Sequence, residues 1–158
     1  MGAETKSQHV GATLRAFLPA DAVAVTEILK ESPQAADWTE GSFGESARWR
    51  GIVALVSEDD GKVTGFLIGR QVADEAEILN LAISVAKRRK GKGGALLNAA
   101  MHEFRARQVS RVFLEVRESN ESGIAFYEKY GFSETGRRPG YYHDPDEVAI
   151  VMEKKLTV

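Results

Sequence analysis

A short run of basic residues and glycines is the part of this sequence that most directly suggests chemistry. Residues 88–94, Arg-Arg-Lys-Gly-Lys-Gly-Gly, lie between an apolar stretch and a segment with helical periodicity. A helix N-terminus presents unpaired N–H groups and a partial positive charge, and both attract phosphate. Glycine lets the backbone approach phosphate oxygens, and basic neighbours add charge-assisted hydrogen bonds. The run therefore predicts a site for a phosphorylated ligand.

The spacing within this run excludes two familiar nucleotide loops. A P-loop needs a final Gly-Lys-Ser/Thr, and a dinucleotide-binding loop needs a third glycine and a second nucleotide-binding half. Taken alone, a Gly/Lys run is more simply explained as a basic surface turn. However, four basic residues at a helix N-terminus oppose the helix dipole and need a compensating anion. We therefore expect a phosphorylated ligand other than ATP or NAD.

The hydrophobic pattern predicts the elements that position this loop. Apolar runs and alternation indicate strands over 14–18, 51–57, 63–72, 76–85, 111–116, 132–142 and 148–155. Helical spacing indicates helices over 19–29, 37–50, 95–104 and 120–130. The strand, long helix and strand between 76 and 116 form a right-handed βαβ unit with parallel strands. The sequence thus predicts an α/β fold with a mixed, mostly antiparallel sheet and helices on both faces.

Length and composition limit the class of protein. The 158 residues fit one domain, which we place at 13–158 after a flexible tail over 1–12. Apolar residues make up 43% and charged residues 28%, as in globular proteins. No apolar run approaches the roughly 20 residues of a membrane-spanning helix, and the start lacks a signal-peptide pattern. We therefore expect a cytoplasmic protein with no membrane partner.

The reactive residue types impose a further limit. The chain has no cysteine, which excludes disulfides, thiolate nucleophiles and zinc–cysteine sites. The three histidines are scattered, and none has another at the spacing of metal ligands. We therefore expect no metal.

Several segments together resemble a known enzyme family. The pattern Arg88-x-x-Gly91-x-Gly93, after the apolar stretch 80–85, is similar to the acetyl-coenzyme A loop of the GNAT superfamily of N-acetyltransferases. Segments 114–120 and 124–132, with 37–43 and 137–142, resemble the RimI-type ribosomal-protein-alanine N-acetyltransferases. The likeness covers nearly the whole chain after residue 13. Lys92 departs from it, because the family often has an apolar residue there.

The resemblance implies acetyl-CoA as the acetyl donor and a GNAT fold whose parallel strand pair splays around it. In this family the pyrophosphate lies on the loop amides, here those of residues 89–94. The pantetheine arm runs beside the preceding strand like an added strand. The implied cofactor-binding residues are Leu81, Ala82, Ile83, Arg88, Arg89, Lys90, Gly91, Lys92, Gly93, Gly94 and Asn120. Core packing explains Leu81 and Ile83 equally well, and helix capping explains Asn120.

The resemblance also assigns the chemical roles. Attack of an amine on a thioester needs a base for the ammonium proton and an acid for the departing thiolate. The family position of the base is Glu115, whose burial in an apolar strand would favour that role, and that of the acid is Tyr127. The alternatives are a Glu115 that points off the sheet edge and a Tyr127 that only packs. The implied acceptor-site residues are Trp38, Tyr141 and Tyr142.

Three functions remain open at this point. The first is acetylation of the N-terminal α-amine of a protein, and the favoured acceptor is a ribosomal protein that begins with alanine. The second is acetylation of a small amine, such as a polyamine, an amino acid or an antibiotic. The third is a nucleic-acid-binding module that uses the basic run Lys87–Lys92. The net charge of −2 and the lack of interleaved aromatic residues weigh against the third.

We therefore expect an acetyl-CoA-dependent N-acetyltransferase whose acceptor is a ribosomal protein N-terminus. We expect no nucleic-acid partner, and a monomer or a weak homodimer.

Overall fold

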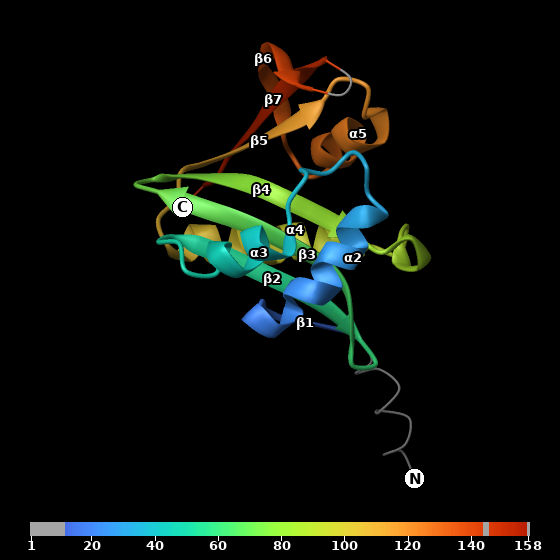
Figure 1. Cartoon of the computed structure of the whole chain (residues 1–158). Helices are drawn as coiled ribbons and strands as arrows, with labels where there is room; N and C mark the ends of the chain where they lie inside the picture. The colour runs from blue at the N-terminus through green and yellow to red at the C-terminus, as the bar shows by residue number, and fades with distance from the viewer. Residues whose placement is uncertain (1–11, 144–145, 158) are drawn as a thin grey trace.

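The computed structural model describes residues 12–143 and 146–157, which form one seven-stranded sheet (Figure 1). The sheet order is β1-β2-β3-β4-β5-β7-β6, and only the β4–β5 pair is parallel. The strands are β1 (Ala12–Ala16), β2 (Ile52–Asp59), β3 (Lys62–Val72), β4 (Glu75–Ile83), β5 (Arg111–Arg117), β6 (Ser133–Tyr142) and β7 (Glu147–Lys155). The predicted tail over 1–12 lies outside the described residues, apart from Ala12, which begins β1.

Helices cover both faces of this sheet, as the sequence predicted (Figure 1). One face packs against α2 and α3, and the other against α4 and α5. The helices are α2 (Ala22–Lys30), α3 (Glu40–Ser46), α4 (Lys92–Ala106) and α5 (Glu121–Lys129), with short 3-10 turns η1 (Pro19–Asp21) and η2 (Val85–Lys87). None of the described helices is long and apolar enough to cross a membrane.

The hairpin of β2 and β3 follows from its turn residues. Asp60 and Gly61 have φ values of +50° and +79°. Two successive residues of positive φ define the type I′ turn, whose twist matches that of the two strands it joins. The hairpin forms at the predicted turn because Asp-Gly is well suited to this conformation.

The parallel strands β4 and β5 pair only at their beginnings. Their register runs through three pairs, Glu75 with Arg111, Ala76 with Val112, and Glu77 with Phe113. Beyond that point β5 stays paired with β7 as far as Arg117, and Figure 1 shows β5 turning away from β4. Residues 78–83 of β4 therefore have no strand partner on the side of β5.

A β-bulge in β4 changes which face its side chains reach. The register with β3 shifts between Ile68 and Gly69, which leaves Leu79 as the extra residue. Leu79 packs on the side of α2 and α3. On the same side, the Asn80 amide nitrogen donates to the Ala36 carbonyl oxygen at 3.3 Å. The side chains of Leu79 and Asn80 thus reach the same face, and the alternation of β4 resets within residues 78–83, the segment with no strand partner on the side of β5.

Candidate active site

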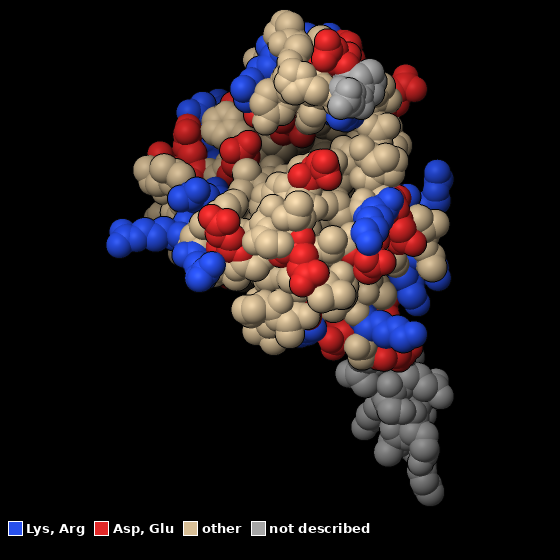
Figure 2. All heavy atoms as spheres, in the orientation of Figure 1, with Lys and Arg blue, Asp and Glu red and all other residues tan. Residues whose placement is uncertain are grey.

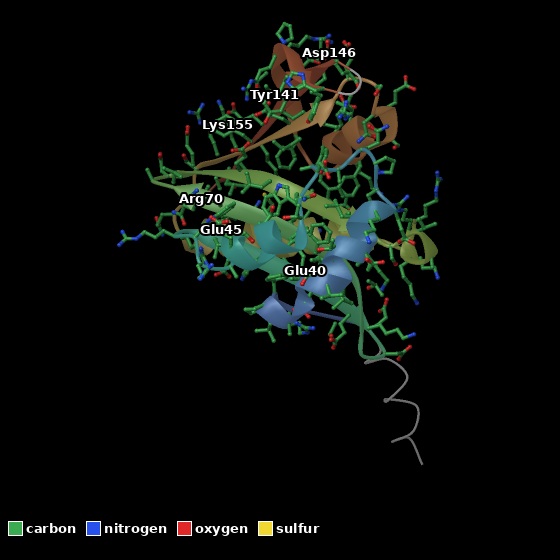
Figure 3. All side chains as sticks on the ribbon, in the orientation of Figure 1. Glu40, Glu45, Arg70, Tyr141, Asp146 and Lys155 are labelled. Carbon is green, nitrogen blue, oxygen red and sulfur yellow. The ribbon has the colours of Figure 1, made fainter. Side chains whose placement is uncertain are left out.

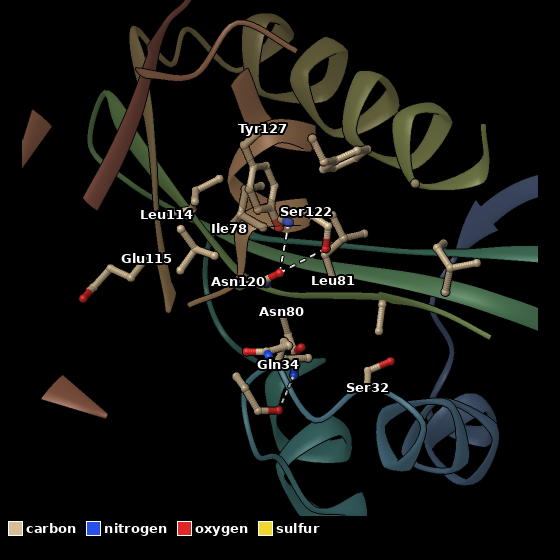
Figure 4. Close-up of a pocket in the computed structure, with 18 of the residues that line it drawn as sticks. Ser32, Gln34, Ile78, Asn80, Leu81, Leu114, Glu115, Asn120, Ser122 and Tyr127 are labelled. Carbon is tan, nitrogen blue, oxygen red and sulfur yellow. Dashed lines mark hydrogen bonds between the residues drawn. The ribbon is translucent and has the colours of Figure 1, made fainter. Parts of the chain in front are cut away.

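A cleft of about 740 Å³ lies at the gap between β4 and β5. This volume is within the range of small-molecule sites. Figure 2 shows part of the cleft as a hollow in the upper part of the molecule, and Figure 4 shows its walls. All but one of the predicted site residues line it, and the exception is the exposed Lys90. The structure therefore brings residues from six separate segments of the chain into one site.

The start of α4 supplies backbone N–H groups to this cleft. Its N-cap, Gly91, has a φ of +78°, a left-handed conformation that favours glycine. The first helical hydrogen bond at this end runs from the Ala95 N–H to the Gly91 carbonyl oxygen at 3.0 Å. The N–H groups of residues 92–94 precede that bond and have no partner within the helix. α4 begins three residues before the predicted start at 95, because glycines contribute nothing to an apolar pattern.

Arg88 holds the shape of this loop. Its guanidinium donates to the Ile83 carbonyl oxygen at 3.0 Å, to the Glu31 carbonyl oxygen at 2.8 Å and to the Ser32 hydroxyl at 2.9 Å. These bonds join the end of β4 to the end of α2. Arg88 and Arg89 are both exposed and both line the cleft. The difference is that the guanidinium of Arg88 is held by these three hydrogen bonds within the protein.

Lys92 is also held within the protein, by an ion pair with Asp59. Its Nζ donates to Asp59 Oδ1 at 2.9 Å and lies 2.8 Å from Oδ2, and the two side chains are only 15% and 10% exposed. The hydrogen bond from Lys92 lowers the pKa of Asp59. Because Lys92 opens α4 and Asp59 ends β2, the pair fastens the loop to the β2–β3 hairpin. This contact accounts for a lysine where the family often has an apolar residue.

Two glycines in the first turn of α4 make room for aromatic rings from α5. A Cβ on Gly93 would lie 3.3 Å from Phe126 Cζ, and a Cβ on Gly94 would overlap the Tyr130 hydroxyl. The Phe126 and Tyr130 rings are themselves 5.0 Å apart, measured between centroids. Tyr130 therefore both packs on α4 and lines the cleft.

Asn120 is the N-cap of α5 and a cleft residue at once. Its Oδ1 accepts a hydrogen bond from the Gly123 N–H at 3.0 Å, as expected for a cap. Its side chain also lines the cleft beside Tyr127. Capping and a contact with the donor are therefore compatible at this residue.

Two carboxylates face the cleft from the side of α2 and α3. Leu114 and Val116 belong to the core beneath α4, so Glu115 between them points to the opposite face. Glu77 also lies between two residues of that core and faces the same way. Burial raises the pKa of Glu77, and the nearby charge of Glu115 raises it further. The sequence prediction missed Glu77, although an acidic residue within an apolar strand is the same signal that selected Glu115.

Tyr127 lines the cleft from the other face of the sheet. Its ring packs against the core beneath α4, with centroids 5.1 Å from Phe126 and 5.8 Å from Phe132. Burial raises the pKa of its hydroxyl, so the group keeps its proton at neutral pH. Figure 4 shows Glu115 pointing away from Tyr127. The residues predicted as base and acid thus reach one cleft from opposite faces of the sheet.

Aromatic residues from two other segments complete the walls. Trp38, before α3, packs with ring centroids 5.1 Å from Phe43 and 5.8 Å from Trp49. Tyr141 and Tyr142 lie at the end of β6, with their ring centroids 5.0 Å apart. Burial raises the pKa of Tyr142 to about 12, and the charge of Glu115 adds to the effect. Figure 3 shows Tyr141 in the upper part of the molecule, on the hairpin of β6 and β7.

The fold and this cleft agree with a comparison of the sequence with family profiles. The profile of the Acetyltransferase (GNAT) family matches residues 22–132. The chain belongs to this family, and it is an acetyl-CoA-dependent N-acetyltransferase.

Individual relatives narrow the comparison. The ribosomal protein bS18-alanine N-acetyltransferase of Escherichia coli K12 is 36% identical over 132 residues, covering 82% of this chain and 88% of the relative. The crystal structure of the Escherichia coli ribosomal-protein-S18-alanine N-acetyltransferase has a TM-score of 0.83 at 32% identity, covering 93% of this chain and 95% of that one. Ard1 from Thermoplasma volcanium has a TM-score of 0.86 at 34% identity, covering 94% and 100%. These likenesses confirm the predicted GNAT fold.

The contact at Gly93 leads to a prediction about donor binding. We expect Gly93→Val to raise the KM for acetyl-CoA by at least about tenfold, because the larger side chain meets Phe126 and narrows the approach to the loop amides. Gly44→Val is the matched control, since a Cβ there has nothing within 4 Å and lies outside the cleft. Initial rates and circular dichroism check both variants. An unchanged KM in folded Gly93→Val would contradict the donor site.

The ion pair of Lys92 and Asp59 leads to a prediction about stability. The folded pKa of Asp59 is below its ordinary value, so the ionised carboxylate stabilises the fold at neutral pH and loses that effect as pH falls through the folded pKa. We expect Asp59→Asn to lower the free energy of unfolding at pH 7, and the difference from wild type to shrink below about pH 4.

Urea unfolding measures this effect. Asp60→Asn, in the adjacent turn, is the control and should change little, because asparagine tolerates positive φ. A double-mutant cycle with Lys92→Met should give a coupling above about 0.5 kcal/mol. A cycle with no coupling would show that the pair does not fasten the loop.

Proposed function

We propose that this protein acetylates the N-terminal α-amine of a ribosomal protein that begins with alanine, with Glu115 as general base and Tyr127 as general acid. The observation that carries the proposal is that these two side chains line one cleft from opposite faces of the sheet. The relatives named ribosomal-protein-alanine N-acetyltransferases support this choice of acceptor.

The cleft suits an acyl-CoA donor in two respects. The edge of β4 over residues 78–83 has backbone groups with no strand partner, and an extended pantetheine arm could pair there as an added strand. The N–H groups of residues 92–94 lie at a helix N-terminus, where a pyrophosphate is stabilised. When bound, acetyl-CoA supplies the acetyl thioester on which the amine acts. Glycine at 91 allows the left-handed N-cap of α4, and glycine at 93 and 94 makes room for Phe126 and Tyr130 beside this helix end.

The two side chains have complementary tasks. The Glu115 carboxylate takes a proton from the incoming ammonium, which leaves a neutral amine as the nucleophile. The Tyr127 hydroxyl gives its proton to the departing sulfur. Tyr127 is protonated at neutral pH, as an ordinary tyrosine is, and burial raises its pKa further, so its proton is in place when the sulfur departs.

The choice of an α-amine follows from proton affinity. The pKa of an α-amino group is about 8 and that of lysine about 10.4, so far more of the α-amine is neutral at pH 7. A carboxylate is then a sufficient base. Trp38, Tyr141 and Tyr142 offer flat walls on which the first residues of an extended peptide chain can pack.

The assigned roles predict the kinetics of two variants. We expect Glu115→Gln to lower kcat by roughly 10²-fold or more. Tyr127→Phe should also lower kcat, with little change in the KM for acetyl-CoA. The control is Glu118→Gln, an exposed neighbour that does not line the cleft. Near-normal turnover of both site variants on a competent acceptor would show that these roles are wrong.

The acceptor is tested with three peptides. One begins with a free alanine, the second is the same peptide with a blocked α-amine and a free lysine, and the third has a blocked α-amine and arginine for that lysine. We expect mass spectrometry to detect acetylation of the first peptide alone. Equal or faster transfer to lysine would refute N-terminal specificity. Turnover on a polyamine, with none of the peptides acetylated, would favour a small-amine acceptor.

A further inference from the structure

A cation already occupies the position at which the acceptor's ammonium must arrive. Arg138, on β6, places Nη1 2.8 Å from Glu115 Oε1 and 3.0 Å from Oε2. One nitrogen thus contacts both oxygens of the proposed base. An acceptor amine that approaches these two oxygens therefore competes with the guanidinium for Glu115.

The surroundings of Arg138 allow it to leave. Its side chain is 55% exposed, whereas that of Glu115 is only 15% exposed. Its guanidinium also lies 4.1 Å from the ring centroid of Tyr141, itself 41% exposed. The register of β6 with β7 shifts just after Arg138, so the backbone beyond it departs from regular pairing. Because ion pairs that are open to water contribute little free energy, exchanging this one for another cation costs little.

The positive charge of Arg138 also compensates the negative charge of the cleft. Glu77 and Glu115 lie close enough to affect one another, and the charge of Arg138 partly offsets the rise in the pKa of Glu77. Without a cation, two carboxylates would face the same hollow with no compensation. An acceptor ammonium carries the same charge as the guanidinium, so replacing one by the other keeps this balance.

We propose that Arg138 is a specificity residue, which holds the place of the acceptor's ammonium and yields only to another cation. The proposal rests on the proposed role of Glu115. A protonated amine can replace the guanidinium at the carboxylate, whereas water, being neutral, cannot compensate the charge that leaves. The pair therefore favours charged amines as acceptors and suppresses hydrolysis of the donor when no acceptor is present.

The suppressed side reaction is hydrolysis of acetyl-CoA. The oxygen of a water molecule forms a bond to the carbonyl carbon of the acetyl group, and the bond from that carbon to sulfur breaks. Glu115 takes one proton from the water, and Tyr127 gives one proton to the sulfur. The proton on Glu115 then restores the Tyr127 hydroxyl by way of solvent, and the second proton of the water is released when acetic acid ionises. The products are acetate, coenzyme A as the thiol and one proton released to solvent.

Arg138→Gln tests the proposal, with Arg137→Gln as the matched control. Arg137 is the neighbouring residue and is 50% exposed, but it pairs with Glu118 and Glu134 instead. For Arg138→Gln we expect acceptor-free hydrolysis of acetyl-CoA to rise and the KM for the peptide with a free N-terminal alanine to fall, each by about two- to fivefold. Arg137→Gln should change neither. The release of free thiol can be followed directly with a thiol reagent, because the chain has no cysteine.

The outcomes separate the two proposals. Wild-type transfer to the peptide tests the proposed function by itself, before any variant is compared. A lower kcat in Arg138→Gln, with hydrolysis and peptide KM unchanged, would overturn the proposal and leave Arg138 as a residue that only positions Glu115. Arg138→Lys keeps the charge and should restore low hydrolysis. If Arg138→Lys hydrolysed acetyl-CoA as fast as Arg138→Gln, that result would equally overturn the proposal.

Discussion

The organisation of this protein depends on a parallel strand pair that stops after three residue pairs. The backbone groups of β4 beyond Glu77 are polar and must find partners outside the protein's own sheet on that side. The gap lies in the middle of the sheet rather than at its edge. It stays open because β5 pairs with β7 over its whole length and β4 stays paired with β3. Beneath the gap, α4 and α5 approach closely at Gly93 and Gly94. The cleft is therefore a consequence of pairing and packing together.

The alternation of strands then decides which chemistry reaches each side of the gap. Neighbours of Glu115 and Glu77 are buried beneath α4, which directs both carboxylates to the face covered by α2 and α3. Tyr127 belongs to a helix on the opposite face, and burial there raises the pKa of its hydroxyl. A one-residue shift in the register of β4 or β5 would move the carboxylate on that strand to the opposite face of the sheet. The bulge at Leu79 shows that the register of β4 is adjusted within the site itself.

Local patterns predicted those parts of the fold that local physics determines. Short stretches of sequence predicted the turn at Asp60 and Gly61, the crossover from β4 through α4 to β5, and the glycine loop. The sequence did not predict the point at which β4 and β5 separate, because that point depends on the pairing of β5 with β7. Likewise, the sequence placed Lys92 in the loop but did not predict its ion pair, because the partner Asp59 is 33 residues away in the chain. The periodicity of a strand predicts which face of the sheet a side chain lies on. It does not predict which residue from another segment that side chain contacts.

The cleft is electrically polar although the chain as a whole is nearly neutral, with a net charge of −2. At one end lie the N-terminus of α4 and the exposed Arg89, and at the other lie Glu77 and Glu115. Arg88 and Lys92 make hydrogen bonds within the protein, so under the proposed function the attraction for phosphate would come mainly from backbone N–H groups and the helix dipole. An anionic donor and a cationic acceptor would then be drawn to different ends. In that proposal their reacting groups meet where β4 and β5 part, between a carboxylate on one face and a phenol on the other.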